Sequence, residues 1–284
     1  MTETPVIKRG FVDVAHGQMH YRHAGGGDAL PLLALHASPG SSRQLIGFIN
    51  SMAGERRVVA PDTPGNGDSV PAFDGERTIM QIAETQLRFM DAAGLDKVDL
   101  YGSHTGAAIA ADLAILAPDR INKVVLDGLM WLTPEELEEL LANYAHPFVP
   151  DRDGSYLIRL YQFCRDQYFF FPWYDRTRAG RRDGGLGTAQ DLHAWVTEVM
   201  KASETYQFNY HAAFRYDAKV QLPKVTVPLL AIAAQTDPLF EMTGQLSQLA
   251  PHGRFEALPR GDAPDFVAAR KAAITAFLDQ PVTA

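Results

Sequence analysis

The sequence has few of the features that mark secreted, membrane-spanning or metal-cluster proteins. Cys164 is the only cysteine in 284 residues, which excludes an intrachain disulfide and a cluster of thiolate metal ligands. No run approaches the roughly 18 apolar residues of a membrane-spanning helix, and the first ten residues, MTETPVIKRG, lack the apolar core of a signal peptide. We therefore expect a cytoplasmic protein that does not interact with a membrane.

Basic charge is also sparse. The chain carries 26 Lys and Arg against 34 Asp and Glu, a formal net charge of −8. The densest basic cluster, RTRAGRR at 176–182, is short and interrupted; we interpret it as a solvated surface, unless the substrate carries a carboxylate. This balance argues against nucleic acid as a partner and favours a small-molecule substrate, while the oligomeric state stays open.

Short apolar runs alternate with helical patterns along most of the chain, which predicts a parallel sheet with helices on both faces. The segment FVDVAHGQMHYRHAGGG near the start instead predicts two antiparallel strands joined by a turn at His16 and Gly17. A final helix is expected at 265–278. The predicted buried strands are 31–36, 57–62, 97–102, 123–128, 227–234 and 254–259.

The alternation stops between about residues 129 and 217, where the sequence is helical and rich in aromatic residues. A helical insertion between two strands of one sheet is the simplest interpretation. We therefore predict a core formed by 1–130 and 219–284, and an insertion at 131–218.

Four motifs stand in an order that resembles the α/β-hydrolase superfamily, specifically its capped members. LHASPG at 35–40 is similar to the family's loop after an early strand, and APDTPGNGDS at 60–69 to its D-x-P-G-x-G-x-S turn. YGSHTG at 101–106 lies where the nucleophile elbow belongs, and AIAAQTDP at 231–238 resembles the strand before the triad acid. The resemblance implies an α/β-hydrolase fold: about eight mostly parallel strands, helices on both faces and a helical cap.

The elbow motif has a histidine where the family usually has a serine nucleophile. The residues two before and two after the nucleophile must be small, because the backbones pass closely there. Centring the motif on His104 places Gly102 and Gly106 at these positions, whereas centring it on Ser103 places the bulkier Tyr101 and Thr105 there. The sequence therefore predicts His104 at the nucleophile's position.

A second departure lies near the C-terminus. The resemblance implies a histidine in the segment LPRGDAPDFV, but Asp262 stands at that position. The implied triad acid is Asp237, with Asp127 as a rival because some capped members place their acid after the preceding strand. The expected catalytic set is therefore His104, Asp237 and Asp262.

Such a set suits acid–base chemistry. Asp237 would fix the imidazole tautomer, and Asp262 would orient water or receive a proton. Backbone N–H groups of Thr105 and of Ala37 or Ser38 would form an oxyanion hole, because main-chain donors survive a side-chain replacement.

Three functions stay open on this evidence. In the first, His104 activates water to hydrolyse a small, largely apolar ester, lactone or related bond. In the second, His104 abstracts a proton and the oxyanion hole holds an enolate, as in a lyase, decarboxylase or isomerase. In the third, the protein is a catalytically inactive ligand-binding pseudoenzyme. No cofactor is implied, and no metal is expected, because no second histidine stands at helical ligand spacing.

Other residues are candidates to line the substrate pocket. They include residues of the aromatic run, Ser103 beside the elbow and the loop histidine His36. His211, like His193, lies on a predicted cap helix and would restore a missing base if it reached His104. The set is His36, Ser103, Asp127, Phe170, Trp173, Tyr174 and His211.

Overall fold

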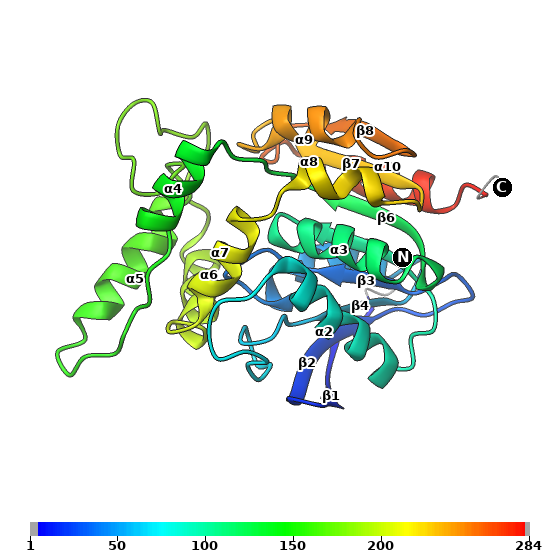
Figure 1. The fold of residues 1–284 in the computed structure, drawn as a ribbon, viewed down its shortest axis with the longest axis horizontal. Helices are drawn as coiled ribbons and strands as arrows, with labels where there is room; N and C mark the ends of the chain where they lie inside the picture. The colour runs from blue at the N-terminus through cyan, green and yellow to red at the C-terminus, as the bar shows by residue number, and fades with distance from the viewer. Residues whose placement is uncertain (1–4, 282–284) are drawn as a thin grey trace.

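A twisted eight-stranded sheet forms the centre of the computed structural model, which describes residues 5–281 (Figure 1). The strand order is β1-β2-β4-β3-β5-β6-β7-β8. β2 pairs antiparallel with both β1 and β4, and all other neighbours run parallel, which confirms the predicted mostly parallel sheet. The strands are β1 Lys8–Val14, β2 Gly17–Ala24, β3 Leu32–Leu35, β4 Val58–Pro61, β5 Val98–Ser103, β6 Ile121–Asp127, β7 Leu229–Ala234 and β8 Gly253–Leu258.

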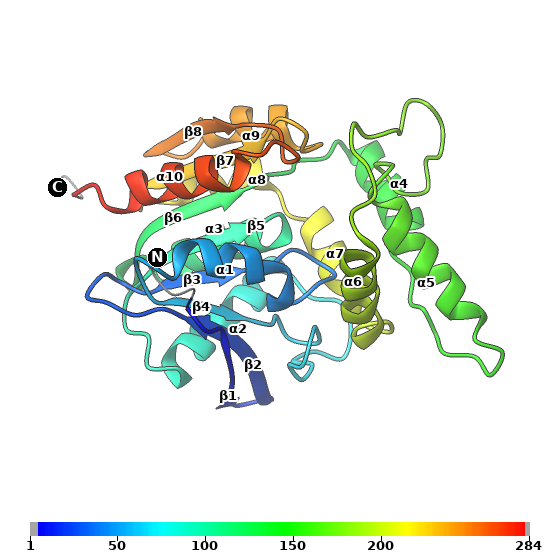
Figure 2. The same cartoon turned by 180° about the vertical axis from the view of Figure 1, so that it is seen from behind.

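Helices cover both faces of the sheet, as the alternating pattern predicted. Figure 1 shows α2, α3, α8 and α9 on one face, and Figure 2 shows α1 and α10 on the other. The helices are α1 Ile46–Met52, α2 Ile79–Ala92, α3 Thr105–Leu116, α4 Pro134–Asn143, α5 Ser155–Asp166, α6 Ala189–Lys201, α7 Tyr206–Phe214, α8 Ala218–Gln221, α9 Phe240–Ser247 and α10 Phe266–Leu278.

The central strands are apolar along their whole length because helices bury both of their faces. Every residue of β3 and of β4 is buried, and successive side chains point into opposite apolar clusters. Since β5, β6 and β7 run parallel, their carboxyl ends share one edge of the sheet. Side chains that follow these strands are therefore brought together there.

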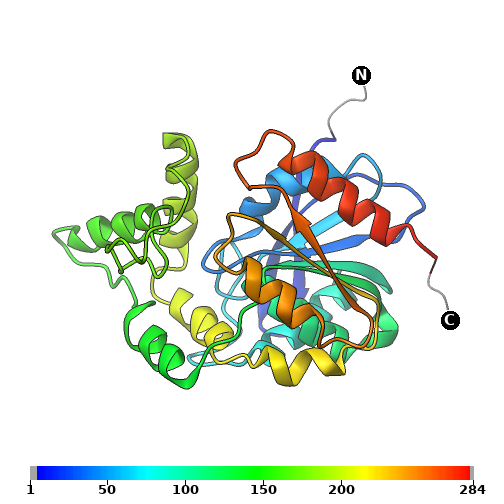
Figure 3. The same ribbon diagram turned by 90° about the horizontal axis from the view of Figure 1, so that it is seen from above.

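The chain between β6 and β7 contains α4 to α8; α4 to α7 stand to one side of the sheet (Figure 3, green to yellow), and α8 returns to its face. We call residues 134–214 the helical segment. Capping boxes at Thr133 and Thr188 start α4 and α6, and buried aromatic residues give the segment an apolar cluster of its own. The boundaries drawn at 131 and 218 stay a prediction. No helix within residues 5–281 is both long and apolar enough to cross a bilayer.

Candidate active site

His104 occupies a strained turn between the end of β5 and the start of α3. Its φ is +51° and its ψ is −111°, a conformation that L-residues rarely adopt. The backbone N–H of His104 donates to the carbonyl of Asp127, 2.8 Å away, which ties the turn to the end of β6. The turn therefore lies at the carboxyl edge of the sheet.

Close backbone contacts on both sides of His104 leave room only for glycine. A Cβ at Gly102 would lie 2.1 Å from the carbonyl oxygen of Gly106, and a Cβ at Gly106 would lie 2.3 Å from that of Leu35. Both distances are far below a normal contact. The steric argument for centring the motif on His104 thus agrees with the backbone geometry.

The imidazole of His104 pairs with Asp237, which follows β7. Nε2 of His104 lies 2.9 Å from Oδ2 of Asp237, while Oδ1 accepts the backbone N–H of Leu239 at 2.8 Å. A carboxylate can only accept hydrogen bonds, so Nε2 carries the proton that faces Asp237. The lone pair of the neutral ring then lies on Nδ1, where it is free to act as a base.

Each member of the pair stabilises the charged form of the other. Burial of the imidazole opposes its protonation, but the charge of Asp237 and the hydrogen bond to it raise the pKa of His104. Burial likewise opposes ionisation of Asp237, but the charge and hydrogen bond of His104 hold the pKa of the carboxyl below its usual range. His104 therefore binds a proton more readily than an unperturbed histidine does.

Two cavities meet at His104. The inner cavity has a volume of about 160 Å³ and the outer cavity about 790 Å³. Ala37, His104, Gln167 and Arg182 line both. Further walls of the inner cavity are apolar or aromatic: Leu129, Met130, Tyr144, Phe171, Tyr210 and Phe214.

The residues expected to form an oxyanion hole lie beside His104. Ala37, Ser38 and Thr105 all line the inner cavity. Thr105 is the first residue of α3, and the first N–H groups of a helix have no acceptor within the helix. Their dipoles favour negative charge at this position. The role of these N–H groups in catalysis stays a prediction.

Comparison with known proteins identifies the fold family. A sequence model described as alpha/beta hydrolase fold matches residues 31–266. The chain belongs to this family.

Similarity to individual proteins of the α/β-hydrolase fold is low or covers only part of the chain. It is 26% identical over 263 residues to Epoxide hydrolase 2 of Siraitia grosvenorii, covering 80% of each chain. It is 34% identical over 106 residues to 2-hydroxymuconate semialdehyde hydrolase of Pseudomonas putida, covering 36% of this chain and 37% of the relative. The enol-lactonase of Burkholderia xenovorans LB400 has the same fold, with a TM-score of 0.71, 20% identity, and coverage of 95% and 100% of the two chains. The first curated relatives, 32–35% identical, are matched over only 27–37% of their length.

Asp262 does not join the pair, which corrects the expected placement of this residue. Its carboxylate is exposed on the loop after β8, where its oxygens accept from Nε and Nη2 of Arg260 at 3.0 and 3.1 Å. It lines neither cavity. The guanidinium two residues earlier holds this side chain at the surface, so the imidazole has Asp237 as its hydrogen-bonded carboxylate.

Asp127, the rival acid, lies close to the site without contacting the imidazole through its side chain. Its buried carboxylate accepts the hydroxyl of Tyr101 at 2.7 Å, and burial raises the pKa of Asp127. Its backbone, as described above, supports the elbow. The geometry favours Asp237 over Asp127 as the partner of His104.

The other candidate histidines point elsewhere. Nδ1 of His36 lies 2.9 Å from the carbonyl oxygen of Ala37, and its Nε2 accepts the N–H of Thr63 at 2.9 Å. Nδ1 of His211 pairs with Glu76 at 2.9 Å. Neither ring lines a cavity, so neither supplies a second base, contrary to the pocket-lining role expected for them.

The aromatic run contributes to the pocket through a residue that the sequence interpretation did not choose. Phe171 lines the inner cavity, whereas Phe170, Trp173 and Tyr174 line neither cavity. The indole of Trp173 donates to the carbonyl of Tyr144 at 2.8 Å, and the hydroxyl of Tyr174 donates to Glu139 at 3.1 Å. These hydrogen bonds turn both rings into the packing of the helical segment. Ser103 does line the outer cavity, as expected.

Sequence reasoning missed Gln167, Arg182, Tyr144 and Tyr210 as lining residues. Tyr210 and Phe214 stand four residues apart on α7, a spacing that places both side chains on one helix face. That signal was available in the sequence. No comparable periodicity distinguishes Arg182 from its neighbours in the basic cluster.

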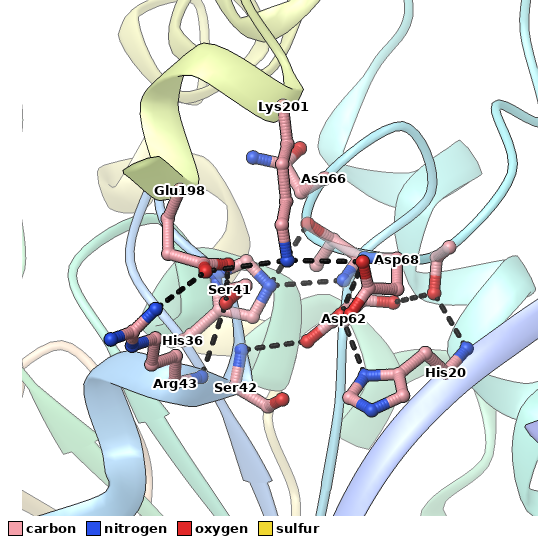
Figure 4. A network of polar contacts seen from close by, with 12 residues as sticks. His20, His36, Ser41, Ser42, Arg43, Asp62, Asn66, Asp68, Glu198 and Lys201 are labelled. Atoms are coloured by element: carbon pink, nitrogen blue, oxygen red, sulfur yellow. Dashed lines mark hydrogen bonds and ion pairs between the residues drawn. The ribbon is translucent and has the colours of Figure 1, made fainter. Parts of the chain in front are cut away.

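A buried polar network lies around the D-x-P-G turn (Figure 4). Asp62 accepts from Nδ1 of His20 at 2.8 Å and from the N–H of Ser42 at 2.8 Å. Burial would raise the pKa of Asp62, but these hydrogen bonds help to lower it to about 2. One ligand atom each of His20, Asp62 and Asp68 lie within 4.8 Å of one another, close enough to hold a metal ion. Since Asp68 also pairs with Lys201 at 3.0 Å, we interpret the group as a structural network.

Proposed function

We propose that the protein is a hydrolase that cleaves a small, largely apolar ester, lactone or related bond, with His104 as the general base. The observation that carries this proposal is the 2.9 Å pair of His104 and Asp237 at the elbow, where two cavities meet. Family membership and relatives named as hydrolases support the reaction class. The helical segment would act as the cap over the site.

The proposed reaction uses water as the nucleophile. Nδ1 of His104 removes a proton from water as the oxygen attacks the substrate carbonyl. The carbonyl oxygen becomes an oxyanion, which accepts hydrogen bonds from Thr105 N–H and from Ala37 or Ser38 N–H. When the tetrahedral intermediate collapses, the leaving alkoxide takes the proton from Nδ1. Asp237 orients the ring and stabilises its protonated form throughout.

The same groups support a second candidate, proton abstraction from carbon with the enolate held by the oxyanion hole. The observation that favours it is that, within residues 5–281, His104 is the only histidine that lines either cavity. A single base suffices for such a step. A decarboxylase, lyase or isomerase would use this arrangement.

Turnover of p-nitrophenyl esters and lactones tests the first proposal. We expect His104→Ala to lower kcat/KM by about 10²–10⁴-fold, the usual contribution of a general base. His193→Gln is a matched control, because His193 is exposed on α6 and lines neither cavity. A fluorophosphonate probe should not label the protein.

Each outcome separates the candidates. Activity unchanged by His104→Ala, or covalent labelling at Ser103, would remove His104 from the proposed role. Absence of hydrolysis, combined with His104-dependent exchange of deuterium into a carbonyl compound, would favour the enolate reaction. Absence of both would indicate a ligand-binding protein.

A further inference from the structure

Arg182 stands at the junction of the two cavities. It lines both of them together with His104, although it belongs to a loop of the helical segment rather than to the sheet. Its position is fixed, because its backbone N–H donates to the carbonyl of Phe169 at 2.8 Å and Nη1 donates to the carbonyl of Gln167 at 2.8 Å. The other guanidinium N–H groups remain available to a ligand.

The positive charge of Arg182 has no carboxylate partner. Within residues 5–281, no Asp or Glu oxygen lies within 4.0 Å of its guanidinium, whereas Arg43 of the outer cavity pairs with Glu198 at 3.5 Å. Arg270, also in the outer cavity, stacks over the ring of Phe48 and likewise has no carboxylate at that distance in the same residues. Arg182 is therefore a half-buried guanidinium without a carboxylate partner in a protein of net charge −8.

The acidic residues of the outer cavity do not neutralise it. Asp191 accepts from the hydroxyl and the N–H of Thr188 at the start of α6. Glu198 is engaged by Ser41, Arg43 and Lys201. Glu198 is thus neutralised, whereas Asp191 keeps its charge, so the three arginines that line the outer cavity, Arg43, Arg182 and Arg270, still outnumber its two carboxylates.

The inner cavity suits an apolar group rather than a charged one. Its walls are mainly apolar, and its volume of about 160 Å³ is comparable to that of the roughly 150 Å³ protein cavity known to admit benzene. One end of a substrate would therefore be apolar and small, and the other end would face the arginines.

We propose that the substrate carries a carboxylate that Arg182 binds at the junction of the cavities, while an apolar group of about the size of an aromatic ring enters the inner cavity. This inference rests on the proposed function for the reaction that follows binding. The binding of a carboxylate by Arg182 does not depend on that reaction. A planar guanidinium binds a carboxylate through two parallel hydrogen bonds, which would orient the substrate as well as hold it. The scissile bond would then lie beside Nδ1 of His104.

Calorimetric titration with a matched pair of unreactive ligands tests the inference. The probes are 3-phenylpropanoate and 3-phenylpropanamide, which share the apolar end and differ in charge. We expect the wild type to bind the carboxylate about 10–100-fold more tightly, the range expected for hydrogen bonds between charged groups. Arg182→Gln should abolish that preference, and Arg182→Lys should retain part of it.

Arg181→Gln is the matched control, because Arg181 is the exposed neighbour in the chain and lines neither cavity. It should leave the preference unchanged. An equal affinity of the wild type for both ligands would overturn the inference, as would a preference that survives Arg182→Gln or disappears only in Arg270→Gln. If Arg182→Gln does not fold, Arg182→Lys decides, since an unchanged preference there contradicts bidentate binding. Because these ligands are not hydrolysed, a protein without hydrolase activity could still pass this test.

Discussion

At the scale of single residues, the strained backbone of His104 indicates that the surrounding structure holds this side chain in place. Within residues 5–281 it is the only non-glycine residue with a positive φ. Such a conformation costs on the order of 1–3 kcal/mol and persists only where the surrounding structure enforces it. The strain directs the imidazole toward Asp237 and the two cavities.

Replacing Asp237 should change the pH dependence of the proposed hydrolysis. As a base, His104 works only when it is neutral, so kcat/KM should rise with pH through the pKa of His104. Burial alone would lower that pKa, but the charge of Asp237 and the hydrogen bond to it, together with the charge of Asp127, raise the pKa above its ordinary value. Asp237→Asn removes the charge, so the acidic limb of the profile should move to lower pH. The plateau should fall by about 10²-fold or more, because the ring loses its orientation.

Profiles of kcat/KM between pH 5 and 9 measure both effects. Asp262→Asn is the matched control: it makes the same chemical change on an exposed carboxylate that pairs with Arg260, and should leave the profile as in the wild type. An acidic limb that stays in place or moves upward in Asp237→Asn would contradict the pairing.

The sequence was sufficient to locate His104 and Asp237, but not to place Asp262 or Arg182. His104 and Asp237 could be found because both lie in motifs that resemble the family's, and each stands within three residues of the end of a buried strand of the parallel sheet. Asp262 could not be placed, because a loop position does not reveal that Arg260 holds the carboxylate at the surface. Arg182 was indistinguishable from its neighbours, since an irregular loop gives no periodicity that reports which side chain turns inward.

At the scale of elements, the packing of α3 against the sheet depends on the glycines of the elbow. In Gly102→Ala the new Cβ would lie 2.1 Å from the carbonyl oxygen of Gly106, so the helix would have to shift. We expect the free energy of unfolding to fall by about 1–3 kcal/mol, or by more if the shift propagates along α3. Urea denaturation followed by circular dichroism measures the change.

Gly47→Ala is the matched control for this prediction. Gly47 is exposed within α1, and a Cβ there meets nothing within 4 Å. Alanine should be neutral or stabilise the helix by up to about 1 kcal/mol, because it loses less backbone entropy than glycine. Equal stability of Gly102→Ala and wild type would show that the close approach is not a constraint.

Strands and helices could be predicted where burial alone determines the pattern of apolar residues. The six predicted parallel strands all formed. Five of them, β3 to β7, lie inside the sheet, where strands covered on both faces are nearly continuously apolar, whereas the edge strand β8 is only partly buried. The ends of the six strands differ from the predicted ones by up to two residues: the strand predicted at 123–128 is β6, Ile121–Asp127, whose start is polar. The helical segment was recognised as helical from its periodicity, but the path of its loops, including the one that brings Arg182 to His104, depends on tertiary contacts.

At the scale of the whole molecule, buried polar contacts attach the helical segment to the core. Glu198 of α6 accepts from Ser41 and pairs with Arg43, which both lie beyond β3 (Figure 4). Asn209 of α7 donates to Asn66 at 2.7 Å. Since Glu198 and Arg43 both line the outer cavity, their contact also holds the segment at its distance from His104.

Glu198→Gln should loosen this attachment without changing the size of the side chain. Glu198 is 3% exposed, and its charge is shared by the cations of Arg43 and Lys201 at 3.5 and 3.4 Å. An amide cannot neutralise them, so we expect a loss of about 1.5–3 kcal/mol, the contribution of hydrogen bonds to charged groups. Hydrogen exchange should accelerate in α6 and α7 more than in β3 to β6, because the segment has its own apolar cluster and can separate from the sheet before the sheet unfolds.

Glu204→Gln provides the comparison, since Glu204 is exposed just beyond the C-terminal end of α6 and undergoes the same chemical change. Its exchange rates should match those of the wild type. Uniform acceleration across the sheet and the helical segment in Glu198→Gln would mean that the two unfold as one unit, and that the polar network stabilises the whole fold. Acceleration confined to α6 and α7 would instead mean that the segment opens on its own, which gives substrate a route to the half-buried pair of His104 and Asp237.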